Sequence, residues 1–205
     1  MHQEVLVSEG RTLFPFLKKF VNFYLAGGTA LALQIGHRVS VDFDLFSSER
    51  IPNSLLSEVK SIFAKREIAV SVDNQDELTV FIDGVKLTFL YYPYPPKKLL
   101  DDFGGLRILD QKEIAATKAY TIGRRGSLKD YVDLYYILVG KISTLEDIIM
   151  SAKEKYGSDF NSRLFLEQLI YLDDVEETEI IFLKDKVSKK ELLKFFSNEI
   201  KNLRL

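Results

Sequence analysis

The spacing of hydrophobic residues changes along this chain and divides it into two parts. Up to residue 96, short apolar segments that alternate like strands are interleaved with short helical segments. We expect strands at 21–26, 39–46, 67–72, 77–82 and 85–92, and helices at 12–20, 29–36 and 52–66. Asp83-Gly84 joins the last two strands and is typical of a tight hairpin turn. The first part therefore predicts a mixed α/β domain over residues 1–96.

After Pro96 the helical period takes over. We expect helices at 110–122, 128–139, 144–156, 160–171 and 186–203. A loop is expected at 123–126, and residues 173–179 carry five acids in seven positions, which is typical of a solvated linker. The second part therefore predicts a helical domain over residues 97–205.

The segment that is most informative about chemistry lies in the first part. A strand ends at Gly27-Gly28, and a helix then starts at Thr29. Backbone N–H groups at the start of a helix, with no Cβ in the way, suit phosphate oxygens, and the Thr29 hydroxyl can add a donor. The alternative is an ordinary turn.

Asp42 and Asp44 lie two residues apart on the strand predicted at 39–46. Their carboxylates therefore point to the same face of the sheet. Two carboxylates on one face repel each other unless a cation lies between them, and hard oxygen ligands of this kind suit Mg²⁺ that also binds substrate phosphates. The alternative is a solvated strand face.

Two helices of the second part carry charges at unexpected positions. Lys118 falls within the apolar stripe of helix 110–122, so it either reaches an anion in a cleft or extends its ammonium to solvent. Helix 128–139 is apolar around most of its circumference, except for an arc of Lys129, Asp130 and Asp133 that we expect to face a cleft. The alternative is a surface pair of Lys129 with Asp133, together with a capping box of Ser127 and Asp130.

Composition and charge narrow the classes of function. The chain has 205 residues, no Cys and two His, which excludes disulfides, thiolate metal sites and a His-rich metal centre. Its net charge is −2, yet residues 97–129 hold eight basic and four acidic residues. This segment, which includes Arg124 and Arg125, is the candidate surface for a polyphosphate or an RNA backbone, the alternative being a basic loop. No signal peptide or membrane span is expected, so we expect a cytoplasmic protein.

These residues resemble a known family. The stretch LAGGTALAL from Leu25, then Gly36-His-Arg, Ser40 and DFDLF at 42–46, is similar to the first motif of the AbiEii/AbiGii-type nucleotidyltransferase toxins. Lys118, Arg124 or Arg125, and KDYVDLYY at 129–136 resemble that family's second motif block. The resemblance covers about residues 21–140.

The resemblance implies an α+β fold, namely a polymerase-β-like nucleotidyltransferase core with a mixed sheet followed by a helical C-terminal domain. It implies Mg²⁺-dependent transfer of a nucleotide from an NTP to an acceptor, which in related toxins is the 3′ end of tRNA, and a cognate antitoxin as partner. Asp42 and Asp44 would hold the metals, and Gly27, Gly28 and Thr29 the phosphates. Lys118 and Lys129 would neutralise the triphosphate, and Asp130 or Asp133 would act as a base or an orienting group.

One departure from the resemblance keeps other functions open. Many nucleotidyltransferases carry a third acid on a later strand, whereas the strand predicted at 85–92 has Lys86 and Thr88 but no acid. The acceptor can also be a protein or a small molecule, and a non-catalytic nucleotide-binding module is a further alternative.

Overall fold

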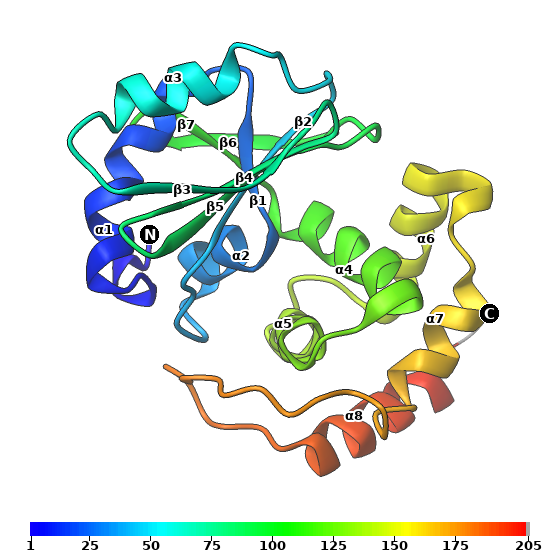
Figure 1. Ribbon diagram of the computed structural model, residues 1–205. Coiled ribbons are helices and arrows are strands. Elements are labelled where there is room, and N and C mark those ends of the chain that lie inside the picture. The colour runs from blue at the N-terminus through cyan, green and yellow to red at the C-terminus, as the bar shows by residue number, and fades with distance from the viewer. Residues whose placement is uncertain (204–205) are drawn as a thin grey trace. The chain divides into compact units, whose positions relative to one another are not determined.

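The computed structural model describes residues 1–203, apart from the side chains of 101–103 and 125. It divides into two compact units, Met1–Asp110 and Gln111–Leu205, and each is described by itself (Figure 1). The boundary falls fourteen residues later than the one predicted at 96/97.

The first unit combines a sheet with short helices. Its α-helices are α1 (Ser8–Leu13), α2 (Gly27–Ile35) and α3 (Leu55–Ile62), and its 3₁₀ helices span Gln3–Val5 and Phe14–Lys19. Its strands are β1 (Tyr24–Ala26), β2 (Phe43–Ser47), β3 (Ile68–Asp73), β4 (Glu77–Ile82), β5 (Val85–Tyr91), β6 (Leu99–Phe103) and β7 (Leu106–Leu109). The expected turn between β4 and β5 is confirmed, because Asp83 and Gly84 both have positive φ angles, 49° and 82°.

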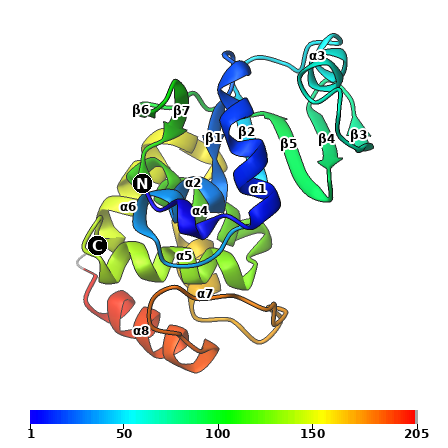
Figure 2. The ribbon, with the colours of Figure 1, turned by 90° about the vertical axis from the view of Figure 1, so that its left-hand side faces the viewer.

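Within the described residues the strands form one mixed sheet in the order β3-β4-β5-β2-β1-β7-β6, which can be followed across Figure 2. β2 pairs with β5 in parallel and with β1 in antiparallel orientation. Side chains alternate between the two faces of the sheet. On one face Phe43 and Phe89 pack against rings from the N-terminal helical segments, such as Phe14 and Phe20. Asp44 therefore lies on the opposite face from this aromatic core.

The hairpin of β6 and β7 was not predicted, and the expectation of helices alone after residue 96 was wrong. β7 pairs with β1 in parallel through Leu25 and Ile108, and the Gln34 side chain donates to the Leu109 carbonyl at 3.0 Å. Gly104 and Gly105 form the turn with φ angles of 65° and 93°. Pairing with a strand eighty residues away in sequence stabilises this short hairpin, and local periodicity does not report such pairing.

The second unit contains the helices that the sequence predicted. They are α4 (Gln111–Arg125), α5 (Leu128–Val139), α6 (Leu145–Tyr156), α7 (Ser162–Leu169) and α8 (Lys189–Lys201), with a 3₁₀ turn at Gly157–Asp159. The loop expected at 123–126 is instead mostly the last turn of α4. Tyr131, Phe165 and Phe196 are fully buried at the centre of this unit. No helix in the described part of the chain is long and apolar enough to cross a membrane.

Candidate active site

The start of α2 lies directly beside the carboxylate of Asp44. Asp44 is the register partner of Ala26, the residue before Gly27, in the antiparallel pair of β2 and β1. Gly27 has a φ of 67°, and a Cβ built on it would lie 2.5 Å from the Asp44 carboxylate oxygen Oδ2. Any larger residue would therefore have to displace the carboxylate, in addition to adopting a left-handed backbone. The Gly-Gly turn thus has a steric reason to be glycine at position 27.

The backbone leading into β2 is held by two buried hydroxyls. The Thr29 side chain donates to the carbonyl of Asp42 and lies 2.7 Å from the hydroxyl of Ser40. Thr29 is 2% exposed and Ser40 is 9% exposed. The hydroxyl that was predicted as a phosphate donor is therefore used to position Asp42.

The N-terminal segment also holds the backbone that leads into β2. The N–H of Ser40 donates to the carbonyl of Val5 at 2.8 Å, and Leu6 forms a parallel bridge with Ser40. Gly36, the last residue of the helix expected at 29–36, ends α2 in a left-handed conformation with a φ of 64°. The chain from α2 to Asp42 is thus fixed at both ends.

Thr88 occupies the position on β5 that is in register with Asp44. Its hydroxyl lies 3.2 Å from the hydroxyl of Thr79 on β4, which in turn contacts the Glu77 carboxylate at 2.6 Å. The sequence analysis did not single out Glu77. It lies two strands away from Asp44, and no group of three or more acidic or His residues suited to a metal occurs in the described residues.

In the second unit Lys118 is held between two carboxylates. Its Nζ lies 2.6 Å from Asp130 Oδ1 and 2.7 Å from Asp133 Oδ2, and the three side chains are 9%, 13% and 0% exposed. The other oxygen of Asp130 accepts hydrogen bonds from the N–H and the hydroxyl of Ser127, which confirms the capping box. Asp130 and Asp133 thus face α4 within this unit rather than an open surface, and the pairing of Asp133 is with Lys118.

Tyr131 follows Asp130 in the chain, and burial, together with charges that include that of Asp130, shifts the pKa of Tyr131. Burial, followed by the charges of Asp174 and Asp130, raises the pKa of Tyr131 to about 12. Its hydroxyl donates to the Gln168 carbonyl at 3.1 Å. The side chain therefore stays neutral in the folded protein well above the pH at which tyrosine ordinarily ionises.

The remaining predicted cations lie outside the Lys118 cluster. The Arg124 guanidinium lies 3.7 Å from the centre of the Tyr120 ring and donates to the Asp159 carbonyl at 3.0 Å. Tyr120 stacks in turn on Tyr156, with ring centres 4.1 Å apart. Lys129 is half-buried on α5, and the Arg125 side chain is outside the described residues.

Comparison with known proteins identifies the family. Residues 11–203 match the family described as the nucleotidyl transferase AbiEii toxin of type IV toxin–antitoxin systems. The chain belongs to the AbiEii family. It is therefore a nucleotidyltransferase by family, which agrees with the resemblance found in its first motif.

Relatives of this AbiEii protein agree with the assignment. An uncharacterized protein of Aquifex aeolicus strain VF5 is 33% identical over 185 residues, which is 88% of this chain and 87% of the relative. The nucleotidyltransferase toxin MenT4 of Mycobacterium tuberculosis H37Rv has a TM-score of 0.60 at 18% identity, over 94% of this chain and 81% of that one. JHP933 of Helicobacter pylori has a TM-score of 0.53 at 18% identity, over 81% and 89% of the two chains. These structural likenesses confirm the α+β nucleotidyltransferase fold.

Proposed function

We propose that this AbiEii protein transfers a nucleoside monophosphate from an NTP to a hydroxyl of RNA, the 3′ end of tRNA being the foremost candidate. The observation that carries the proposal is the contact geometry of Gly27 and Asp44. Amides at the start of α2 suit phosphate oxygens, and here they lie beside a carboxylate of the kind that holds a phosphate-bound cation.

A magnesium ion fits the residues present in the first unit. Asp42 and Asp44 are both half-buried, so each carboxylate is reachable. The strand expected at 39–46 begins only at Phe43, so Asp44 lies on β2 while Asp42 lies in the segment just before it. Mg²⁺ is typically bound by one or two carboxylates, with waters and substrate phosphates completing the shell. Thr88 in place of a third acid is therefore compatible with one such ion. When bound, the ion would neutralise charge on the reacting phosphates.

The protein's own residues would supply positioning. The N–H groups of Gly27 and Gly28 would hold phosphate oxygens, and the buried Thr29 hydroxyl would keep Asp42 in place through its carbonyl. Lys129, Arg124 and Arg125 are the cations of the second unit that we assign to the triphosphate or the RNA backbone. Lys118 keeps its ammonium between Asp130 and Asp133, so we assign this cluster a positioning role.

Family membership also favours a biological role. We propose that the activity is toxic to the cell that makes it, that it acts in the cytoplasm, and that a cognate antitoxin neutralises it, because the family is described as the toxin of type IV systems.

A small-molecule acceptor is the second candidate. The antibiotic-resistance factor ANT(2'')-Ia has a TM-score of 0.50 at 12% identity, over 72% of this chain and 92% of that one. A similar fold thus occurs in an antibiotic-resistance factor. A protein acceptor and a non-catalytic nucleotide-binding role remain as outcomes of the test.

A transfer assay distinguishes these acceptors. The full chain is incubated with Mg²⁺, each labelled NTP in turn, and either total tRNA, cell protein or an antibiotic that carries hydroxyl groups. We expect label in the tRNA band. Label in protein or in the small molecule alone would reassign the acceptor, and nucleotide-dependent thermal stabilisation without label transfer would favour the non-catalytic module.

A further inference from the structure

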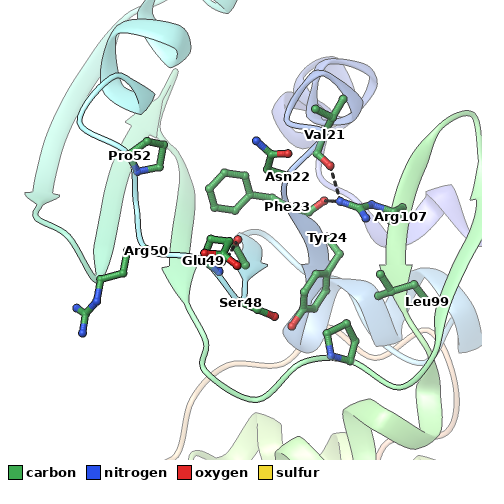
Figure 3. Close-up of a pocket in the computed structure, with 12 residues that line it drawn as sticks. Val21, Asn22, Phe23, Tyr24, Ser48, Glu49, Arg50, Pro52, Leu99 and Arg107 are labelled. Atoms are coloured by element: carbon green, nitrogen blue, oxygen red, sulfur yellow. Dashed lines mark hydrogen bonds between the residues drawn. The ribbon is translucent and has the colours of Figure 1, made fainter.

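The first unit contains a cavity at the end of the sheet away from Asp44 (Figure 3). Its volume is about 570 Å³, which is within the range of small-molecule and cofactor sites. The walls come from the start of β1, the segment after β2, and the chain around Pro96 and Leu99. Since β1 and β2 are antiparallel, Tyr24 and Phe46 lie at this end of the pair, whereas Ala26 and Asp44 lie at the other.

The walls of this cavity offer flat apolar surfaces. Tyr24 lines it and packs edge-to-face on Phe46, with ring centres 6.2 Å apart. Pro52, Pro96 and Leu99 complete the apolar lining. Surfaces of this kind accept a planar ring, such as a nucleobase, by stacking and apolar contact.

A fixed positive charge borders the cavity. The Arg107 guanidinium donates to the carbonyl of Val21 and, at 3.4 Å, to the carbonyl of Phe23. The dashed line between Val21 and Arg107 in Figure 3 marks the first of these hydrogen bonds. These two carbonyl partners are neutral, so they do not cancel the charge of Arg107. Two further charged residues line the cavity, the acid Glu49 and the cation Arg50. Asn22 and Ser48 also line the cavity and can form hydrogen bonds with a base edge or a sugar.

An aromatic path leads away from the cavity. The Phe46 ring lies 4.8 Å from Tyr92, and Tyr92 lies 5.5 Å from Tyr94. Tyr92 and Tyr94 are half-buried, and the segment continues through Pro95 and Pro96 to the exposed Lys97. Partly exposed rings that follow one another, with cations nearby, are typical of proteins that bind single-stranded nucleic acid without strong sequence preference.

We propose that this cavity holds an unpaired nucleotide of the acceptor RNA, with its base on the Tyr24 side and its phosphate near Arg107, while the nucleotides on its 5′ side stack on Tyr92 and Tyr94. The inference rests on the proposed function, since it names where the RNA acceptor is held. Ser47 lies three residues from Asp44, which is roughly 10 Å along β2. An RNA strand whose 3′ end lies at Asp44 therefore reaches the cavity within a few nucleotides.

Equilibrium binding of a short RNA tests this site without turnover. Fluorescence anisotropy is measured with a labelled single-stranded oligoribonucleotide of about ten residues and the full chain, without NTP or metal. We expect Tyr94→Ala to raise the Kd at least about fivefold, since loss of one stacked base has an effect of this size or larger. Arg107→Gln should raise the Kd by a similar factor.

The controls separate a local effect from loss of charge or loss of fold. Arg163→Gln removes the same charge from a side chain that is 89% exposed in the second unit, and it should leave the Kd within about twofold. Circular dichroism checks that each variant is folded. Asn22→Asp, at an exposed position, should also weaken binding by adding a negative charge, so the proposal stays testable if Arg107→Gln unfolds the protein.

Two results would overturn the inference. The first is a Kd for the short RNA that is the same for Tyr94→Ala, Asn22→Asp and the control Arg163→Gln. The other is complete competition by a free mononucleotide at the concentration of the RNA, which would assign the cavity to a small ligand. Failure of the proposed function has a different signature: the wild type transfers no label to RNA, whatever these Kd values are.

Discussion

Gly27 is the residue at which the candidate site is most sensitive to a small change. Gly27→Ala places a methyl group 2.5 Å from the Asp44 oxygen and also puts a side chain at a φ of 67°. We expect nucleotidyl transfer to fall by at least about tenfold, because displacement of a reacting group by about 1 Å costs that much or more. The unfolding free energy should fall by about 1–2 kcal/mol from the left-handed backbone alone.

Gly84→Ala is the matched control for this change. Gly84 also has a positive φ, of 82°, but nothing lies within 4 Å of a Cβ built there. Its variant should lose a similar amount of stability and keep its transfer rate. Equal transfer rates for the two variants would show that the contact of Gly27 with Asp44 has no part in the chemistry.

Tyr131 makes stability depend on pH at the alkaline end. Its folded-state pKa of about 12 exceeds the ordinary value of about 10, so the folded state holds the proton more tightly. Its contribution is therefore complete below about pH 10 and is lost as the pH rises toward 12. In urea unfolding, the stability difference between wild type and Tyr131→Phe should shrink between about pH 9 and about pH 11.5. A constant difference over this range would contradict the burial of an un-ionised Tyr131.

At the scale of elements, α4 and α5 are joined by one buried cation and two carboxylates. Lys118→Met leaves Asp130 and Asp133 without their cation, so we expect a loss of about 3–5 kcal/mol of unfolding free energy in urea. The double variant Lys118→Met with Asp133→Leu should recover part of this loss. Lys153→Met on α6 removes an exposed cation and should change stability by less than about 0.5 kcal/mol. If Lys118→Met lost no more stability than Lys153→Met, the cluster would not be buried in solution.

The elements also show how far sequence patterns reach. Long amphipathic helices such as α6 and α8 follow from periodicity alone, and so does the β4–β5 hairpin with its Asp83-Gly84 turn. The pair of β6 and β7 does not, because it depends on β1. The candidate site likewise has parts that the sequence predicts and parts that it does not. Asp42, Asp44 and the Gly-Gly turn stand out in the sequence. The pairing of Lys118 with Asp130 and Asp133 joins two helices, so only the structure reveals it.

At the scale of the whole molecule, the basic segment that stood out in the sequence is divided between the two units. Residues 97–110 hold three basic and three acidic residues, whereas residues 111–129 hold five basic residues and one acidic residue. The excess of positive charge thus belongs to the second unit, and part of it, Lys118, is already neutralised. Of the five basic residues at 111–129, Lys118 is therefore not available to an RNA backbone.

The few cations that we assign to the RNA predict a weak dependence of RNA binding on salt. With Arg107, Arg124, Arg125 and Lys129 as contacts, the slope of log K against log salt should be about −3, since each phosphate contact on a single strand contributes about −0.7. Binding of the short RNA at several salt concentrations measures the slope. A slope steeper than about −5 would mean that a much larger basic surface is involved.

The central claim is that Asp44, beside the start of α2, takes part in nucleotidyl transfer. The most direct test measures label transfer from NTP to tRNA with Mg²⁺ for the wild type, Asp44→Asn and Asp73→Asn. Asp73 is an exposed carboxylate on β3, so its variant loses the same charge away from the site. We expect transfer by the wild type and by Asp73→Asn within about twofold of each other, and transfer by Asp44→Asn at least about 100-fold slower. Transfer by Asp44→Asn at the wild-type rate would contradict the account.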